Sequence, residues 1–167
     1  MPGLAGIVDP TGVDSDVLER MVSALKHEDW YSVNLCCDGV IGLGRVSLGK
    51  LNPEQQPIFN KDRSLCICME GELYDYAGIK QDLIESGHCF TVNNEPELVL
   101  HLYEEFGVNF AEKLNGAFVA AIWDFVKHRL VIVNDRMGLR PLYYAQNGQR
   151  LLFASLAEQT PDESNKD

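Results

Sequence analysis

Five cysteines are the side chains of this chain that are best suited to nucleophilic or metal chemistry. They are Cys36, Cys37, Cys66, Cys68 and Cys89. Cys66 and Cys68 are two residues apart, so on a strand both thiols would share one face and could bind a soft metal ion. No CxxC pair or well-spaced histidine joins them, and no Cys–His–Asn signature surrounds any cysteine. We therefore interpret all five as packed structural thiols and expect no metal site.

Sequence patterns typical of cofactor binding, nucleic-acid binding or membrane insertion are absent from this chain. It has no glycine-rich phosphate loop, so we expect no ATP binding and no cofactor. The net charge of -11, from 25 acidic and 14 basic residues, disfavours nucleic acid and anionic membranes as partners. No apolar run reaches the ~20 residues that span a bilayer, and the first residues do not resemble a signal peptide. These features, with an odd number of cysteines, predict a cytoplasmic protein without a disulfide framework.

The elements that would position a site follow from the hydrophobic pattern. Leu4 to Val8 is a short apolar run that predicts a strand, and it ends at a turn containing proline and glycine. The next apolar residues, up to Leu25, are spaced as one helical face, and Asp16 with Glu19 resembles a capping box. Further along, the pattern predicts an irregular segment at 27–38, a strand at 40–48, a loop at 51–57 and a strand at 64–69.

Two helices are predicted in the middle of the chain. Asp75 is expected to cap the first, which ends at Gly87, and Asn94 is expected to cap the second, which ends at Gly107. The residues expected to face inward are Ile79, Leu83, Ile84, Leu98, Val99, Leu102, Tyr103 and Phe106. A further short turn of helix is expected at 110–114.

The last third of the chain is rich in strand-forming residues. Strands are predicted at 117–123, 129–133, 142–145 and 151–154. Asn147 and Gly148, between the last two, are a strong hairpin signal. Strands flank a central helical block without regular strand–helix alternation. The pattern therefore predicts an α+β fold of antiparallel sheets with packed helices, and not a doubly wound parallel sheet.

Several segments carry a family resemblance, and they occur in order along the chain. They are Met1–Ile7, Gly71–Tyr76, Glu97–Gly107, Leu114–Asp124, Asp135–Tyr144 and Leu152–Ser155. Together they resemble the glutaminase domain of asparagine synthetases, a class II glutamine amidotransferase domain. The resemblance implies a domain over 1–155 with the N-terminal-nucleophile (Ntn) hydrolase fold, a four-layer αββα sandwich of two antiparallel sheets. We interpret 156–167 as an acidic, disordered tail.

The resemblance also indicates where catalysis would occur. In this family a cysteine follows the initiator methionine, and it supplies both the nucleophilic thiol and, through its free α-amine, the base. Pro2 stands at that position, so the thiol is missing, and a proline amine acting as the base is a minor alternative. The implied oxyanion-hole positions are Glu70 and Gly71, where the family has asparagine and glycine. An ionised glutamate can only accept hydrogen bonds, so the side-chain donor is lost whether Glu70 faces the oxyanion or solvent.

A substrate clamp is implied as well. The substrate-binding positions are Arg45, Val46, Ser47, Gly71, Glu72 and Glu95. Arg45 matches the family arginine that grips the glutamine carboxylate, for which a bidentate guanidinium is well suited. Glu95 stands where the family has the aspartate that holds the substrate α-amine, and it is one methylene longer. From residue type alone, Arg45 would be a surface charge and Asn94 a helix cap.

The departures at positions 2, 70 and 95 leave three functions open. The first is a degenerate glutaminase-like domain that cannot hydrolyse glutamine and that supports or regulates a synthetase domain or subunit. The second is a module that senses glutamine or another small amino acid through Arg45, Gly71 and Glu95. The third is an active amidotransferase that supplies ammonia for asparagine synthesis, if the chain start is altered. The sequence leaves the oligomeric state open, including a homo-oligomer.

Overall fold

The computed structural model describes residues 2–157, and its strands form two antiparallel sheets. The first sheet has the order β2-β3-β1-β9-β8 and consists of β1 (Gly3–Val8), β2 (Ser32–Asp38), β3 (Ile41–Ser47), β8 (Tyr143–Asn147) and β9 (Arg150–Ala154). The second has the order β4-β5-β6-β7 and consists of β4 (Ile58–Phe59), β5 (Leu65–Leu73), β6 (Gly116–Asp124) and β7 (Arg129–Asn134).

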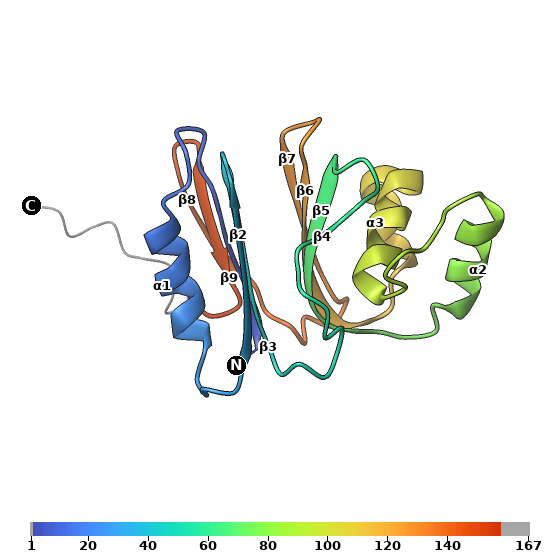
Figure 1. Cartoon of the computed structure of the whole chain (residues 1–167), viewed down its shortest axis with the longest axis horizontal. Coiled ribbons are helices and arrows are strands. Elements are labelled where there is room, and N and C mark those ends of the chain that lie inside the picture. The colour runs from blue at the N-terminus through green and yellow to red at the C-terminus, as the bar shows by residue number, and fades with distance from the viewer. Residues whose placement is uncertain (1, 158–167) are drawn as a thin grey trace, which may run out of the picture.

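Helices cover the outer faces of both sheets. Helix α1 (Ser15–Leu25) packs on the first sheet, and α3 (Glu95–Phe106) packs on the second, with α2 (Ala77–Glu85) outside it (Figure 1). A 3₁₀ helix, η1 (Gly107–Lys113), follows α3 and packs against it. The arrangement confirms the predicted αββα sandwich. Among the described residues, no helix has the length and apolar content needed to cross a bilayer.

Three apolar layers hold the sandwich together. One lies between α1 and the first sheet, one between the two sheets, and one between the second sheet and α3. Strand β5 contributes to two of them because successive side chains of a strand point to opposite faces. Cys66 and Cys68 lie in the layer between the sheets, whereas Ile67 and Met69 lie in the layer under α3. The prediction that the two cysteines share one face is confirmed.

Most of the predicted elements are present. Asn94 caps α3, because its Oδ1 accepts a hydrogen bond from the backbone N–H of Glu97 at 3.0 Å. Gly107 ends the same helix. The predicted β8–β9 hairpin is present: Asn147 ends β8 and pairs with Arg150, and Gly148 and Gln149 form the turn, which suits the positive φ of 60° at Gly148. Leu156 packs against the α1 layer, and the rest of the predicted tail from residue 158 lies outside the described residues.

The prediction of an irregular segment at 27–38 was wrong for its second half, which forms β2. This strand is at the edge of the first sheet, and most of its side chains are exposed. Polar and apolar residues alternate only from Ser32 to Leu35 before Cys36 and Cys37 interrupt the pattern, so the signal for a half-buried strand is short. Its structure comes instead from pairing with β3, from Ser32 opposite Ser47 to Asp38 opposite Ile41.

Two predicted helix caps were also wrong. Asp14 caps α1, because its carboxylate accepts from the backbone N–H groups of Asp16 and Val17, and Asp16 lies inside the first turn. Asp75 has a φ of 54°, so it cannot begin a helix, and α2 starts after Tyr76 without a side-chain cap. For α1 the sequence offered two acidic residues as caps and did not distinguish them, whereas α2 has no side-chain cap at all.

Two side chains predicted to face inward do not. Ile84 is 46% exposed because α2 lies outside α3 and buries only Leu83. Phe106 is 40% exposed because it occupies the last turn of α3, where the Nζ of Lys113 lies 4.2 Å from the centre of its ring.

Candidate functional site

Strands from both sheets and the start of one helix carry the predicted site residues. Gly3 pairs with Val46, so Pro2 lies beside the end of β3 that carries Arg45. Strands β3 and β5 contact each other across the layer between the sheets, and β5 carries Glu70 (Figure 1). Glu95 begins α3. The sandwich therefore brings together segments that are far apart in the sequence.

Arg45 and Glu70 form a buried ion pair between the sheets. The Nε of Arg45 donates to Oε2 of Glu70 at 2.9 Å, and the two side chains are 1% and 4% exposed. The other two guanidinium nitrogens also donate: Nη1 to the carbonyl of Asn52 at 3.0 Å and Nη2 to that of Leu51 at 2.9 Å. The alternatives of a surface charge for Arg45 and a solvent-facing Glu70 are therefore wrong.

The electrostatics of Glu70 reflect this pairing. Burial raises the pKa of the Glu70 carboxyl above its ordinary value, while the Arg45 guanidinium opposes the shift by favouring the carboxylate. Arg140 acts in the same direction as Arg45. Its loop is held by the buried Asp135, whose Oδ2 accepts from the backbone N–H of Arg140 at 3.0 Å. An amino-acid substrate would offer Arg45 a carboxylate, and here the chain itself supplies one.

Asn52 links the ion pair to Glu95, a role that no sequence pattern indicated. Its Nδ2 lies 3.3 Å from both the carbonyl of Gly71 and Oε2 of Glu95, and its Oδ1 accepts from the backbone N–H of Glu95 at 3.3 Å. Glu95 Oε2 also accepts from the backbone N–H of Leu73 at 2.9 Å. The only sequence signal was an asparagine in a proline-containing loop, which suits its φ of 45°.

Gly71 is required at its position by both conformation and space. Its φ is 112°, and a Cβ there would lie 2.1 Å from the backbone oxygen of Ala117 on the neighbouring strand. Glu72, next to it, accepts a hydrogen bond from the hydroxyl of Tyr74 at 3.3 Å. The predicted site therefore has a glycine whose backbone is constrained by β6.

The two residues after Arg45 are buried, and Val46 points to the opposite face of β3 from Arg45. Val46 packs in the layer under α1, because it points to the opposite face of β3. Ser47 is 2% exposed, and its Oγ accepts from the backbone N–H of Gly49 at 3.1 Å. Their part in substrate binding stays a prediction.

No thiol occupies the position of the family nucleophile. Pro2 is half-buried, and the buried thiols closest in sequence to Glu70 are Cys66 and Cys68. Burial raises the pKa of Cys66 to about 12 and raises the pKa of Cys68 as well. Both thiols are therefore protonated at neutral pH, and a protonated thiol is a poor nucleophile. His27, in the loop after α1, is exposed.

Comparison with known proteins places this arrangement in a family. The model of the glutamine amidotransferase domain matches residues 1–163. Asparagine synthetase [glutamine-hydrolyzing] 2 of Bacillus subtilis is 34% identical over 93% of this chain. The amidase chry2 of Gibberella zeae is 33% identical over 83% of it. The chain spans 21% of the length of each of these relatives.

A solved structure agrees with the fold. It is a glutamine phosphoribosylpyrophosphate (PRPP) amidotransferase from B. subtilis complexed with ADP and GMP, and it superposes on 92% of this chain and 41% of its own, with a TM-score of 0.74 and 19% identity. At 19% sequence identity, this similarity supports the fold and nothing further. Because the family model covers nearly the whole chain and the fold is the two-sheet sandwich of Ntn hydrolases, this chain belongs to the class II glutamine amidotransferase domain family.

Proposed function

We propose that this domain does not hydrolyse glutamine and instead supports or regulates a synthetase domain. The observation that carries the proposal is the buried ion pair between Arg45 and Glu70. Glu70 acts against the reaction in two ways. It removes the side-chain donor from the oxyanion-hole position, and its carboxylate binds the guanidinium that would hold the substrate carboxylate. Pro2 removes the nucleophile independently.

The same contacts disfavour amino-acid sensing as the function. A ligand carboxylate would have to displace Glu70 from a guanidinium that also donates to two backbone carbonyls. Displacement would leave the carboxylate of Glu70 buried without its partner, which is costly. Glu95, the predicted partner of the ligand amine, already accepts from Asn52 and from the backbone of Leu73.

A glutaminase assay tests the catalytic part of this proposal. We expect the purified chain to form glutamate from glutamine no faster than a heat-inactivated sample, because position 2 has no thiol and position 70 has no donor. In the same buffer, glutamine at about 10 mM should leave the melting temperature of the chain unchanged. A ligand that binds only the folded state would raise that temperature. Turnover that a thiol-blocking reagent abolishes would contradict the proposal, because it would reveal an active cysteine.

An exposed edge supports the partner part of the proposal. Every residue of β8 is exposed, and β8 is the edge strand of the first sheet. Exposed apolar side chains lie both in the preceding loop, where Met137 is 81% and Leu139 64% exposed, and on β8 itself, where Tyr144 is 72% exposed. Exposed sheet edges and clustered apolar side chains are typical of interaction surfaces. We assign this surface, residues 137–147, to a synthetase domain, the class named in the asparagine synthetase relatives, acting in the cytosol.

Hydrogen exchange tests this assignment. We expect the backbone amides of 137–147 to gain protection when the chain is mixed with the synthetase portion of the B. subtilis relative, because docking would cover them. Strand β7, the edge of the other sheet, is the internal control and should not change. The double variant Leu139→Ser, Tyr144→Ser should lose the protection and keep its fold, since both side chains are exposed. Equal protection at β7, or none at either edge, would count against this surface.

A further inference from the structure

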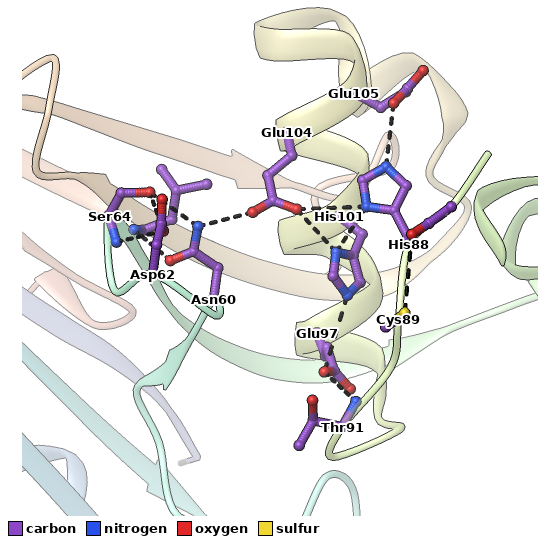
Figure 2. Close-up of polar contacts among 12 residues, drawn as sticks. Asn60, Asp62, Ser64, His88, Cys89, Thr91, Glu97, His101, Glu104 and Glu105 are labelled. Atoms are coloured by element: carbon purple, nitrogen blue, oxygen red, sulfur yellow. Dashed lines mark hydrogen bonds and ion pairs between the residues drawn. The ribbon is translucent and has the colours of Figure 1, made fainter.

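A second polar cluster lies on the far side of the second sheet from the Arg45–Glu70 pair. It consists of His88, in the segment between α2 and α3, and His101 and Glu104 on α3 (Figure 2). The two ring Nδ1 atoms are 3.0 Å apart. Oε2 of Glu104 lies 2.9 Å from Nδ1 of His101 and 3.6 Å from Nδ1 of His88. Three atoms that can each donate a lone pair therefore meet around one point.

These separations match the ligands of a small cation. A tetrahedral Zn²⁺ with bonds of about 2.0–2.2 Å to nitrogen and oxygen holds its ligand atoms ~3.3 Å apart. The three measured separations lie on both sides of that value. Two imidazoles with one carboxylate are a ligand set that zinc sites use, with water at the fourth position. Mg²⁺ and Ca²⁺ prefer oxygen ligands alone, so the set favours a transition metal.

Hydrogen bonds among the three groups satisfy the cluster less well than a cation would. If the Nδ1 of His101 carries a proton and donates it to Glu104, an unprotonated Nδ1 of His88 receives no hydrogen bond from His101. If the Nδ1 atoms of His88 and His101 both carry a proton, their two N–H groups face each other, with the nitrogens 3.0 Å apart. One divalent ion accepts a lone pair from all three atoms and removes the conflict.

Outer partners hold the ligands in the orientation that metal binding requires. The Nε2 of His88 lies 3.2 Å from Oε2 of Glu105, and Oε1 of Glu104 accepts from Nδ2 of Asn60 at 2.8 Å (Figure 2). Nε2 of His101 is buried and has no hydrogen-bond partner within residues 2–157, and Oε1 of Glu97 lies 4.0 Å away. Carboxylates that accept the outer N–H of a ligating imidazole are a regular feature of metal sites.

We propose that His88, His101 and Glu104 bind a divalent transition-metal ion of the zinc class. The side chains of the two histidines are 15% and 12% exposed and that of Glu104 is 29% exposed, so water can reach the fourth position. Glu104 and Asn60 also line a surface cavity of about 310 Å³ that leads to solvent. A bound ion would join three segments: the α2–α3 connection, α3, and, through Asn60, the β4–β5 turn.

The sequence did not indicate this site. The two histidines are thirteen residues apart, and only His101 and Glu104, three apart on α3, have a local spacing. The expectation of no metal site rested on cysteines, which take no part in the cluster. His88 reaches α3 because the chain turns back after α2, which local spacing does not predict.

Zinc titration of the tag-free, chelator-treated chain tests the proposal. We expect calorimetry to show that one equivalent of Zn²⁺ binds, and elemental analysis to show that it remains bound after desalting. The bound Zn²⁺ should also raise the melting temperature. Mg²⁺ should give none of these results. With Co²⁺ as a probe, the visible spectrum should show tetrahedral nitrogen and oxygen ligation without a thiolate charge-transfer band. No zinc retention by the folded chain would overturn the site.

Matched variants assign the ligands. His88→Gln and Glu104→Gln should each abolish retention of the ion, and the outer-partner variant Glu105→Gln should weaken affinity by ~10-fold. His27→Gln is the control histidine and Cys89→Ser the control thiol beside the site; both should bind as the parent does. Unchanged affinity in His88→Gln and Glu104→Gln, with circular dichroism showing a native fold, would contradict the assignment, as would loss of binding in Cys89→Ser.

Discussion

Combining Pro2→Cys with Glu70→Asn should raise glutamine hydrolysis ~100- to 1000-fold above that of Pro2→Cys alone. The single variant regains a thiol beside a free α-amine, but Glu70 still binds Arg45 and still offers no donor to an oxyanion. The second change frees the guanidinium for the substrate carboxylate and places an amide N–H at position 70. Glutamate formation, followed by a coupled dehydrogenase assay, measures the ratio of the two rates.

The control for this experiment is Pro2→Ala combined with Glu70→Asn. It frees the same guanidinium but has no thiol, so its rate should stay at the level of the heat-inactivated sample. Intact mass must show that the initiator methionine is absent, because the reaction needs the free amine at position 2. If the cysteine-containing double variant is no faster than Pro2→Cys alone while both are folded, the ion pair is not what blocks the site.

Replacing Glu70 by leucine should lower the free energy of unfolding by about 3–5 kcal/mol, because it leaves the buried guanidinium of Arg45 without its counter-ion. For a domain of this size that loss corresponds to a fall in melting temperature of roughly 6–20 °C. Urea denaturation and calorimetry measure both quantities. Glu28→Leu, at an exposed position, is the matched control and should change stability by no more than ~0.5 kcal/mol.

The double variant Arg45→Met, Glu70→Leu distinguishes loss of the pair from loss of packing. An apolar pair of similar volume has no buried charge, so the double variant should be more stable than Glu70→Leu alone. The non-additive part of the two effects is the coupling between the two side chains. A double variant less stable than Glu70→Leu alone would mean that the bonds from Arg45 to the carbonyls of Leu51 and Asn52 stabilise the fold by more than the unpaired guanidinium destabilises it.

Local patterns were sufficient for much of the fold. The cap at Asn94 and the hairpin signalled by Asn147 and Gly148 depend on neighbours within a few residues, and both are present. Strand β2 was missed because its alternation of polar and apolar residues is confined to Ser32–Leu35, and pairing with β3 determines its structure. The prediction of two sheets in a four-layer sandwich came from the family resemblance, because sheet order depends on pairings between distant segments.

The candidate site was only partly predictable, because its contacts cross the layer between the sheets. Arg45 and Glu70 were both identified, but as a substrate clamp and a degenerate donor, and not as partners of each other. They are 25 residues apart on different sheets, so no local spacing connects them. Asn52 and Arg140 were missed for the same reason: their effects on Glu95 and Glu70 exist only once the loops have folded.

The ion pair has a consequence for how this domain could regain activity by successive point mutations. Reversion at position 2 alone would bring no selectable benefit, because the substrate arginine stays bound to Glu70. Reversion at position 70 alone would first produce a less stable protein that still has no nucleophile. Each single step toward the active enzyme is therefore neutral or harmful, and only the combination is favoured. Under the proposed function, the salt bridge would make catalysis difficult to regain by single substitutions, even though few residues separate the two states.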